Sequence, residues 1–80
     1  MVIEVADTTL VIDREVKAPL YAKAGISEYW IINLIDNQIE TFHSPQVGVY
    51  QHTSVYGIND EVKTQFNKSI VVKVGSCLDF

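Results

Sequence analysis

The sequence lacks several features that would define its class at once. It has one cysteine, Cys77, so no disulfide can form within the chain, which favours a reducing compartment and predicts a cytoplasmic protein. Six Lys and Arg against ten Asp and Glu give a net charge of -4, so the basic surface of an ordinary nucleic-acid binder is missing. No run approaches the about 18 apolar residues of a membrane helix, because Asn33 and Asp36 interrupt the longest one. We therefore expect no membrane partner.

The composition that remains is that of a small folded domain. Hydrophobic residues make up 48% of the 80 residues and charged residues 20%, while glycine and proline together occupy few positions, so disorder and fibrous repeats are both excluded. A chain of this size buries only roughly 60% of the surface that it exposes when unfolded. We find no repeat and no linker, and we treat residues 1–80 as a single domain.

The first third of the chain predicts a strand followed by a helix. Residues 2–6 are an apolar strand in which Glu4 would share a face with Val2 and Ala6. Residues 10–24 carry an apolar stripe at helical spacing, formed by Val16, Leu20 and Ala24, and Gly25 stands where such a helix would end.

Proline interrupts this helical pattern. Pro19 has no N–H group and its ring clashes with the carbonyl four residues earlier, so we expect a kink or an irregular turn near Glu15.

The remaining segments predict strands. Residues 28–34 are aromatic and β-branched, as in a central strand, and a turn at Asp36–Asn37 joins them to an alternating strand over residues 38–42. A break at Ser44–Pro45 precedes a strand over residues 48–56, and short strands follow at 62–66 and 70–74. The predicted fold class is α+β, with the order β-α-β followed by an antiparallel β-meander.

Glu4 is the most informative single residue, because a carboxylate inside an apolar strand is costly to desolvate unless something compensates it. Lys17, on the following helix, is the natural partner. Two simpler interpretations remain open at this point. Glu4 can lie at a solvent-exposed position, and Asp13 can pair with Lys17 at spacing i,i+4 on the helix surface.

The other reactive side chains do not form a recognisable motif. His43 and His52 have no third ligand at metal spacing, which disfavours a zinc site, and they are expected at the surface. Cys77 has no histidine nearby in the sequence and is expected to be an inert thiol. The glycines are isolated, so we expect no nucleotide or other small-molecule cofactor.

The order of residues carries more information than their chemistry. The strand VIEV, Asp13 and Lys17 on the helix, the turn YAKAGI and the strand EYWII resemble the Uma2 family of endonucleases, also described as a domain of unknown function. That family belongs to the PD-(D/E)xK nuclease superfamily, so the resemblance implies a restriction-endonuclease-like core. It covers nearly the whole chain, and it is weakest between residues 56 and 74.

The resemblance implies particular roles. In such nucleases two carboxylates and a lysine surround Mg²⁺, which polarises the scissile phosphate of DNA and helps to generate hydroxide. Carried over by position, Glu4 would be the metal-binding and catalytic carboxylate, with the carbonyl of Val5 as a further ligand. Ala6 occupies the usual lysine position, and Lys17 matches a relocated catalytic lysine better than Lys23 does.

The chain also departs from the family pattern. Members carry a PD dipeptide on an upstream strand, which these 80 residues do not contain, so we expect a C-terminal portion of an Uma2-like domain with weak Mg²⁺ binding. Asp7 could supply a second oxygen. Without the upstream strand, the strand at 2–6 would be an exposed edge that pairs with a second copy, which predicts a homodimer.

Two functional hypotheses follow from these observations. The first is a metal-dependent endonuclease that acts on DNA phosphodiesters and is inactive or incomplete in the 80-residue form. The alternative is a non-catalytic, truncated module that forms a small homo-oligomer through its exposed strand edge.

Overall fold

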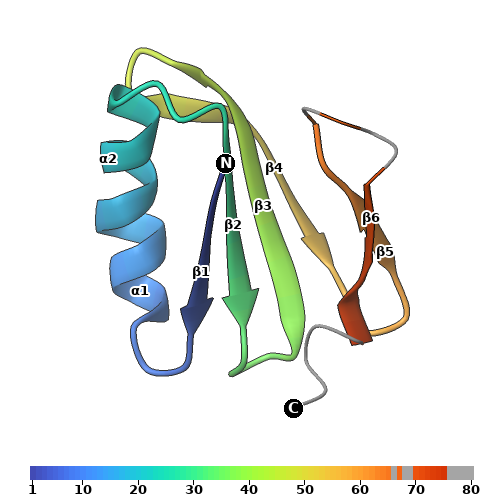
Figure 1. The fold of residues 1–80 in the computed structure, drawn as a ribbon. Helices are drawn as coiled ribbons and strands as arrows, with labels where there is room; N and C mark the ends of the chain where they lie inside the picture. The colour runs from blue at the N-terminus through green and yellow to red at the C-terminus, as the bar shows by residue number, and fades with distance from the viewer. Residues whose placement is uncertain (66, 68–69, 76–80) are drawn as a thin grey trace.

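The computed structural model describes residues 1–65, 67 and 70–75, and it has the predicted α+β fold. One helix lies against a four-stranded sheet, and a two-stranded sheet stands at the opposite side of that sheet (Figure 1). The elements in chain order are β1 (Val2–Ala6), α1 (Leu10–Ile12), a π-helical turn (Asp13–Lys17), α2 (Ala18–Lys23), β2 (Glu28–Asn33), β3 (Gln38–Gln46), β4 (Val49–Tyr56), β5 (Glu61–Lys63) and β6 (Val71–Lys73).

The main sheet has the strand order β1-β2-β3-β4. β1 runs parallel to β2, and β2, β3 and β4 are antiparallel to their neighbours, as the predicted order of β-α-β and meander requires. Within the described part of the chain, no strand pairs with the other edge of β1. The strand that carries Glu4 is therefore an edge strand, as predicted.

The helix is continuous but irregular at the predicted place. The N–H of Ala18 donates to the carbonyl of Asp13, a bond between residues i and i+5 that defines the π-helical turn. This wider turn ends at Lys17, two residues before Pro19, where a regular helix would need an N–H and would bring the proline ring against the carbonyl of Glu15. A π-helical turn is thus the form that the predicted irregularity takes.

The end of the helix is fixed by Gly25. Its φ of +77° is the left-handed conformation that glycine adopts without strain. Its N–H donates to the carbonyl of Ala22 at 3.1 Å, and the N–H of Ile26 donates to that of Tyr21 at 3.0 Å. These two bonds form a Schellman motif, and the helix ends at Gly25 as predicted.

The face that the helix turns to the sheet differs from the predicted stripe. Leu10, Ala18 and Ala22 are buried, whereas Val16 and Leu20 are each 59% exposed. The small alanine side chains let the helix approach the aromatic residues of the sheet closely, and the larger aliphatic residues are left on the outside. The expectation that Val16 and Leu20 mark the core face was wrong.

Two hydrophobic clusters lie on opposite faces of the main sheet. The first, under the helix, is built around Tyr29 and Ile31, and the second around Trp30 and Ile39. Alternate residues of β2 serve the two faces, so this strand is covered on both sides, as predicted for a central strand.

The predicted break between two strands at Ser44–Pro45 is wrong. β3 continues through both residues, and the chain reverses at Val47–Gly48, where φ is +53° and +74°. A two-residue turn with both φ positive is the type I′ turn that suits twisted hairpins. The prediction failed because a β-branched valine is an unusual residue at positive φ.

The last two strands form a separate sheet in place of extending the meander. β5 pairs only with β6 among the described strands, and both are shorter than predicted. Val62 and Val74 pack against Trp30 and complete the second cluster. The predicted last turn, with Cys77, lies outside the described residues. Over the described residues, no helix has the length and apolar character needed to cross a membrane.

Candidate functional site

Glu4 lies at the middle of β1 and points toward the helix. It shares the helix-side face with Val2 and Ala6, both of which belong to or pack against the first cluster, as strand alternation predicts. Its side chain is 21% exposed, so it is neither fully buried nor free in water. The carboxylate therefore sits at the boundary between the core and the solvent.

Three donors surround the Glu4 carboxylate. Lys17 Nζ donates to Oε2 at 2.8 Å, the Tyr21 hydroxyl donates to Oε1 at 2.5 Å, and the Tyr29 hydroxyl lies 3.4 Å from Oε2. The expected partnership of Glu4 with Lys17 is confirmed, and the simpler interpretation of a solvated, unpartnered Glu4 is wrong. Each carboxylate oxygen has its own strong donor.

Lys17 also contacts Asp13. The lysine therefore pairs with Glu4 and with Asp13 at the same time. Its Nζ lies 3.3 Å from Asp13 Oδ1, at spacing i,i+4. This contact is an ion pair without hydrogen-bond geometry, because Oδ1 has no hydrogen-bond partner in the described structure. Asp13 is only 1% exposed, and Thr9 Oγ1 lies 3.3 Å from its other oxygen. Asp13 is thus a buried part of the site, and the prediction of a surface pair was wrong on that point.

These contacts shift the charge states of the site. Burial raises the pKa of Glu4, but the hydrogen bonds from Lys17 and Tyr21 outweigh burial and leave the pKa below its usual value. The hydrogen bond to Glu4, followed by the ion pair with Asp13, raises the pKa of Lys17. The hydrogen bond to Glu4 likewise raises the pKa of Tyr21. At neutral pH the site consists of a carboxylate, an ammonium and a neutral phenol.

A second ion pair, between Arg14 and Glu40, joins the same helix to β3. Glu4, Ile31 and Glu40 lie in one row across β1, β2 and β3. The Arg14 guanidinium donates two hydrogen bonds to the Glu40 carboxylate, one of them from Nε to Oε1 at 2.7 Å. The Glu40 side chain is 6% exposed, against 21% for Glu4. Of the two pairs, the one at Glu4 is the more accessible to a ligand.

The two remaining metal-ligand candidates are less well placed. The Ala6 carbonyl accepts from the Leu34 N–H at 2.9 Å, so by strand alternation the Val5 carbonyl points to the open edge of β1. Asp7 is exposed in the bend after β1, and no hydrogen bond of the described residues joins it to Glu4.

We tested whether these residues suit Mg²⁺, which prefers six oxygen ligands in octahedral geometry. The described residues contain no group of three or more His, Cys, Asp or Glu side chains that could hold a metal ion. Both Glu4 oxygens already accept hydrogen bonds, and the Asp13 carboxylate contacts Lys17. The residues described do not form a complete Mg²⁺ site, and we assign no catalytic step to this ion.

The fold and the site together define the class of the protein. A carboxylate on the parallel edge strand of a mixed sheet, faced by a lysine from the next helix in an α+β fold, is consistent with the restriction-endonuclease-like class. A family model named Uma2, with the description "Putative restriction endonuclease", matches residues 1–70. The chain belongs to the Uma2 family. Comparison with curated proteins and with solved structures gives no significant match.

Sequence reasoning missed the two tyrosines at the site. Tyr21 lies four residues after Lys17, which places both side chains on one side of a helix, so this signal was available. Tyr29 belongs to the aromatic segment predicted as the central strand, and it is fully buried and packs against Tyr21 with ring centres 5.0 Å apart. Its hydroxyl nevertheless reaches Glu4.

Proposed function

We propose that the chain provides the glutamate and lysine of an Uma2-type, metal-dependent endonuclease site that acts on DNA phosphodiesters. The observation that carries this proposal is the contact of 2.8 Å between Lys17 Nζ and the partly exposed Glu4 carboxylate. Membership of a family described as a restriction endonuclease supports DNA as the substrate.

The chemistry of the described residues supports a charge-stabilising role for Lys17. Its side chain is 39% exposed, so the ammonium can meet a phosphate oxygen while Glu4 and Asp13 keep it in place. Tyr21 holds the other Glu4 oxygen, which fixes the carboxylate against rotation. Glu4 and Lys17 would act as the catalytic residues, and Tyr21 and Asp13 as positioning residues.

The same geometry supports a low activity for this chain alone. With one partly exposed carboxylate, a divalent cation would keep most of its water ligands and bind weakly. The net charge of -4 adds repulsion between the protein and the DNA backbone. We therefore expect slow cleavage by the 80-residue form.

A plasmid assay tests this proposal. With protein in excess over supercoiled DNA and with Mg²⁺ or Mn²⁺ present, we expect slow conversion to the nicked form, and at least about 100-fold slower conversion by Glu4→Gln and Lys17→Met. Lys23→Met removes the same charge from an exposed position on the same helix and should nick at the wild-type rate. Absence of metal-dependent nicking by the wild type, or equal nicking by Glu4→Gln, would refute the proposal.

The open edge of β1 supports a second proposal, a homodimer formed by pairing of two such edges. Ile3 and Val5 on this strand are 49% and 55% exposed, and an apolar edge strand is a template for another strand. Sedimentation equilibrium should give a dimer for the wild type and a monomer for Val5→Lys. Val11→Lys, at an exposed position of the helix, is the matched control and should stay dimeric. A monomeric wild type would exclude this proposal and leave the nuclease proposal untouched.

A further inference from the structure

A buried carboxylate lies on the sheet face that is turned away from the helix. Glu28, at the start of β2, is 2% exposed and lies on the same face of the strand as Trp30. Its Oε2 accepts from Trp30 Nε1 at 2.8 Å, and the Gln65 N–H is shared between Oε1 at 3.0 Å and Oε2 at 3.1 Å. These donors are neutral, so they hold the carboxylate in place without balancing its charge.

The other buried carboxylates of the described residues each contact a cation. Asp13 pairs with Lys17, and Glu40 pairs with Arg14. Glu28 forms no ion pair with any residue that the structure describes. Because a buried charge without a partner of opposite sign is costly, the position of Glu28 favours a cation from outside the chain.

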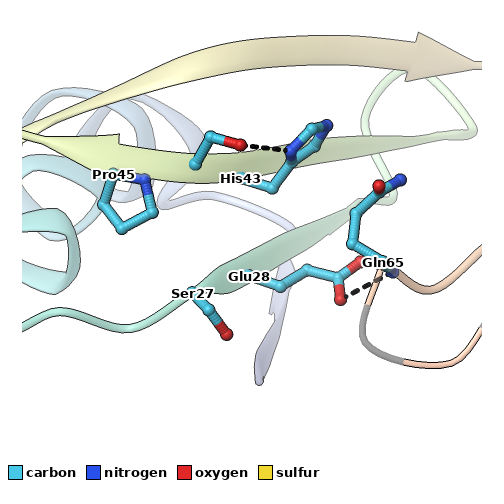
Figure 2. Close-up of a pocket in the computed structure, with 6 residues that line it drawn as sticks. Ser27, Glu28, His43, Pro45 and Gln65 are labelled. Carbon is cyan, nitrogen blue, oxygen red and sulfur yellow. Dashed lines mark hydrogen bonds between the residues drawn. The ribbon is translucent and has the colours of Figure 1, made fainter.

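A hollow beside Glu28 gives such a cation access. It has a volume of about 370 Å³ and is bordered by Ser27, Glu28, His43, Ser44, Pro45 and Gln65 (Figure 2). His43 is the register partner of Glu28 on β3, and its ring stacks on that of His52 with centres 4.9 Å apart. A water molecule takes up roughly 30 Å³ in the liquid, so the hollow has room for a ligand of several heavy atoms.

The free acceptor sites of the carboxylate decide between an ammonium and a guanidinium ligand. A carboxylate has about four lone-pair sites, and the contacts with Trp30 and Gln65 use two on Oε2 and one on Oε1. The site left on Oε1 suits one N–H group of an ammonium. A guanidinium that binds both oxygens needs a further site on Oε2. The hydroxyls of Ser27 and Ser44 border the same hollow and can accept other N–H groups of the ammonium.

We propose that this hollow binds a primary alkylammonium ion, with its ammonium group against Glu28 and its methylene groups against Pro45. This chemistry is shared by free aliphatic amines and by the lysine side chain of a peptide. The site lies on the opposite face of the sheet from Glu4, so it is independent of the proposed nuclease function.

The fluorescence of Trp30 tests the proposal, because Trp30 is the single tryptophan of the chain and its indole N–H contacts Glu28. Titration of the full chain with n-butylammonium chloride, at neutral pH and low salt, should give a saturable change with a dissociation constant on the order of 1 mM. n-Butanol lacks the charge, tetramethylammonium lacks the N–H donor, and guanidinium has the wrong donor arrangement. All three should bind at least about tenfold more weakly.

Two further titrations distinguish the sources of the ammonium group. Putrescine is a free diamine, and Nα-acetyl-lysine amide carries the lysine side chain of a peptide. Tighter binding of putrescine would assign the site to free amines, and tighter binding of the blocked lysine would assign it to a peptide. Failure of both to compete with n-butylammonium would count against the proposal.

Variants place the binding at Glu28. Glu28→Gln should weaken n-butylammonium binding at least about tenfold, whereas Glu61→Gln removes the same charge from an exposed position on β5 and should bind like the wild type. Because Glu28 is buried, a second variant leaves it in place. Ser27→Lys adds a positive charge at an exposed residue that borders the hollow, and it should also weaken binding at least about tenfold.

Val11→Lys is the matched control for Ser27→Lys, because it adds the same charge at an exposed position of the helix, and it should bind like the wild type. The absence of a saturable response in the wild type, or equal binding of n-butanol, would overturn the proposal. Wild-type binding by Glu28→Gln or by Ser27→Lys would do the same.

Discussion

Replacement of Glu40 by alanine is expected to lower the free energy of unfolding by about 2–3 kcal/mol. Glu40 is 5% exposed, and its carboxylate accepts from both arms of Arg14 and, at 2.8 Å, from Nδ2 of Asn33, which is completely buried. Loss of one partner of a buried pair costs about 3–5 kcal/mol. We expect less here because the Arg14 side chain is 42% exposed and can be rehydrated.

Urea denaturation followed by circular dichroism measures this effect. For a small domain with marginal stability, a loss of this size should shift the midpoint strongly or leave the chain largely unfolded. Glu61→Ala removes the same charge from an exposed position on β5 and should change the stability by less than about 0.5 kcal/mol. A change for Glu40→Ala as small as that of the control would contradict the proposed anchoring role.

The same pair makes the stability depend on pH. Burial raises the pKa of Glu40, but the hydrogen bonds from Arg14 and Asn33 outweigh burial and lower it below its usual value. The unfolded chain therefore binds this proton at a higher pH than the folded chain does. The contribution of Glu40 to the free energy of unfolding is present in full above its pKa in the unfolded chain, about 4.3. This contribution is lost as the pH falls through the lower pKa of Glu40 in the folded chain. Part of the acid sensitivity should disappear in Glu40→Ala.

Local signals in the sequence were sufficient for much of the fold. The β1 strand, the end of the helix at Gly25 and the irregularity before Pro19 follow from glycine, proline and alternation within a few residues. The pairing of Glu4 with Lys17 also followed, because a strand and the helix after it pack together and each residue needed a partner of opposite charge.

Features that depend on distant contacts were not predictable in this way. Arg14 and Glu40 are 26 residues apart, and only the register of three strands brings Glu40 beneath the helix. The contact between His43 and His52 likewise depends on the hairpin turn at Val47–Gly48. The predicted break at Ser44–Pro45 was incompatible with this pairing. The sequences of β5 and β6 are too short to indicate whether they extend the main sheet or form a separate one. Packing against Trp30 places them in a separate sheet.

The charge coupling at Glu4 gives the second prediction of large effect. Among the contacts that offset the burial of Glu4, the hydrogen bond from Lys17 lowers its pKa the most. In Lys17→Met the carboxylate keeps its burial and the Tyr21 hydroxyl but loses the ammonium, so its pKa should rise clearly above the wild-type value. Lys23→Met is the matched control, because Lys23 is exposed at the end of α2, where its side chain lies against Gly48.

A ¹³C NMR titration of the Glu4 carboxyl group in the wild type, Lys17→Met and Lys23→Met tests most directly whether Glu4 and Lys17 act as one charged unit. For Glu4 we predict a pKa below the usual glutamate value in the wild type and in Lys23→Met. In Lys17→Met we predict a pKa for Glu4 that is clearly above the wild-type value. An ordinary pKa for Glu4 in the wild type, unchanged when Lys17 is replaced, would contradict the account.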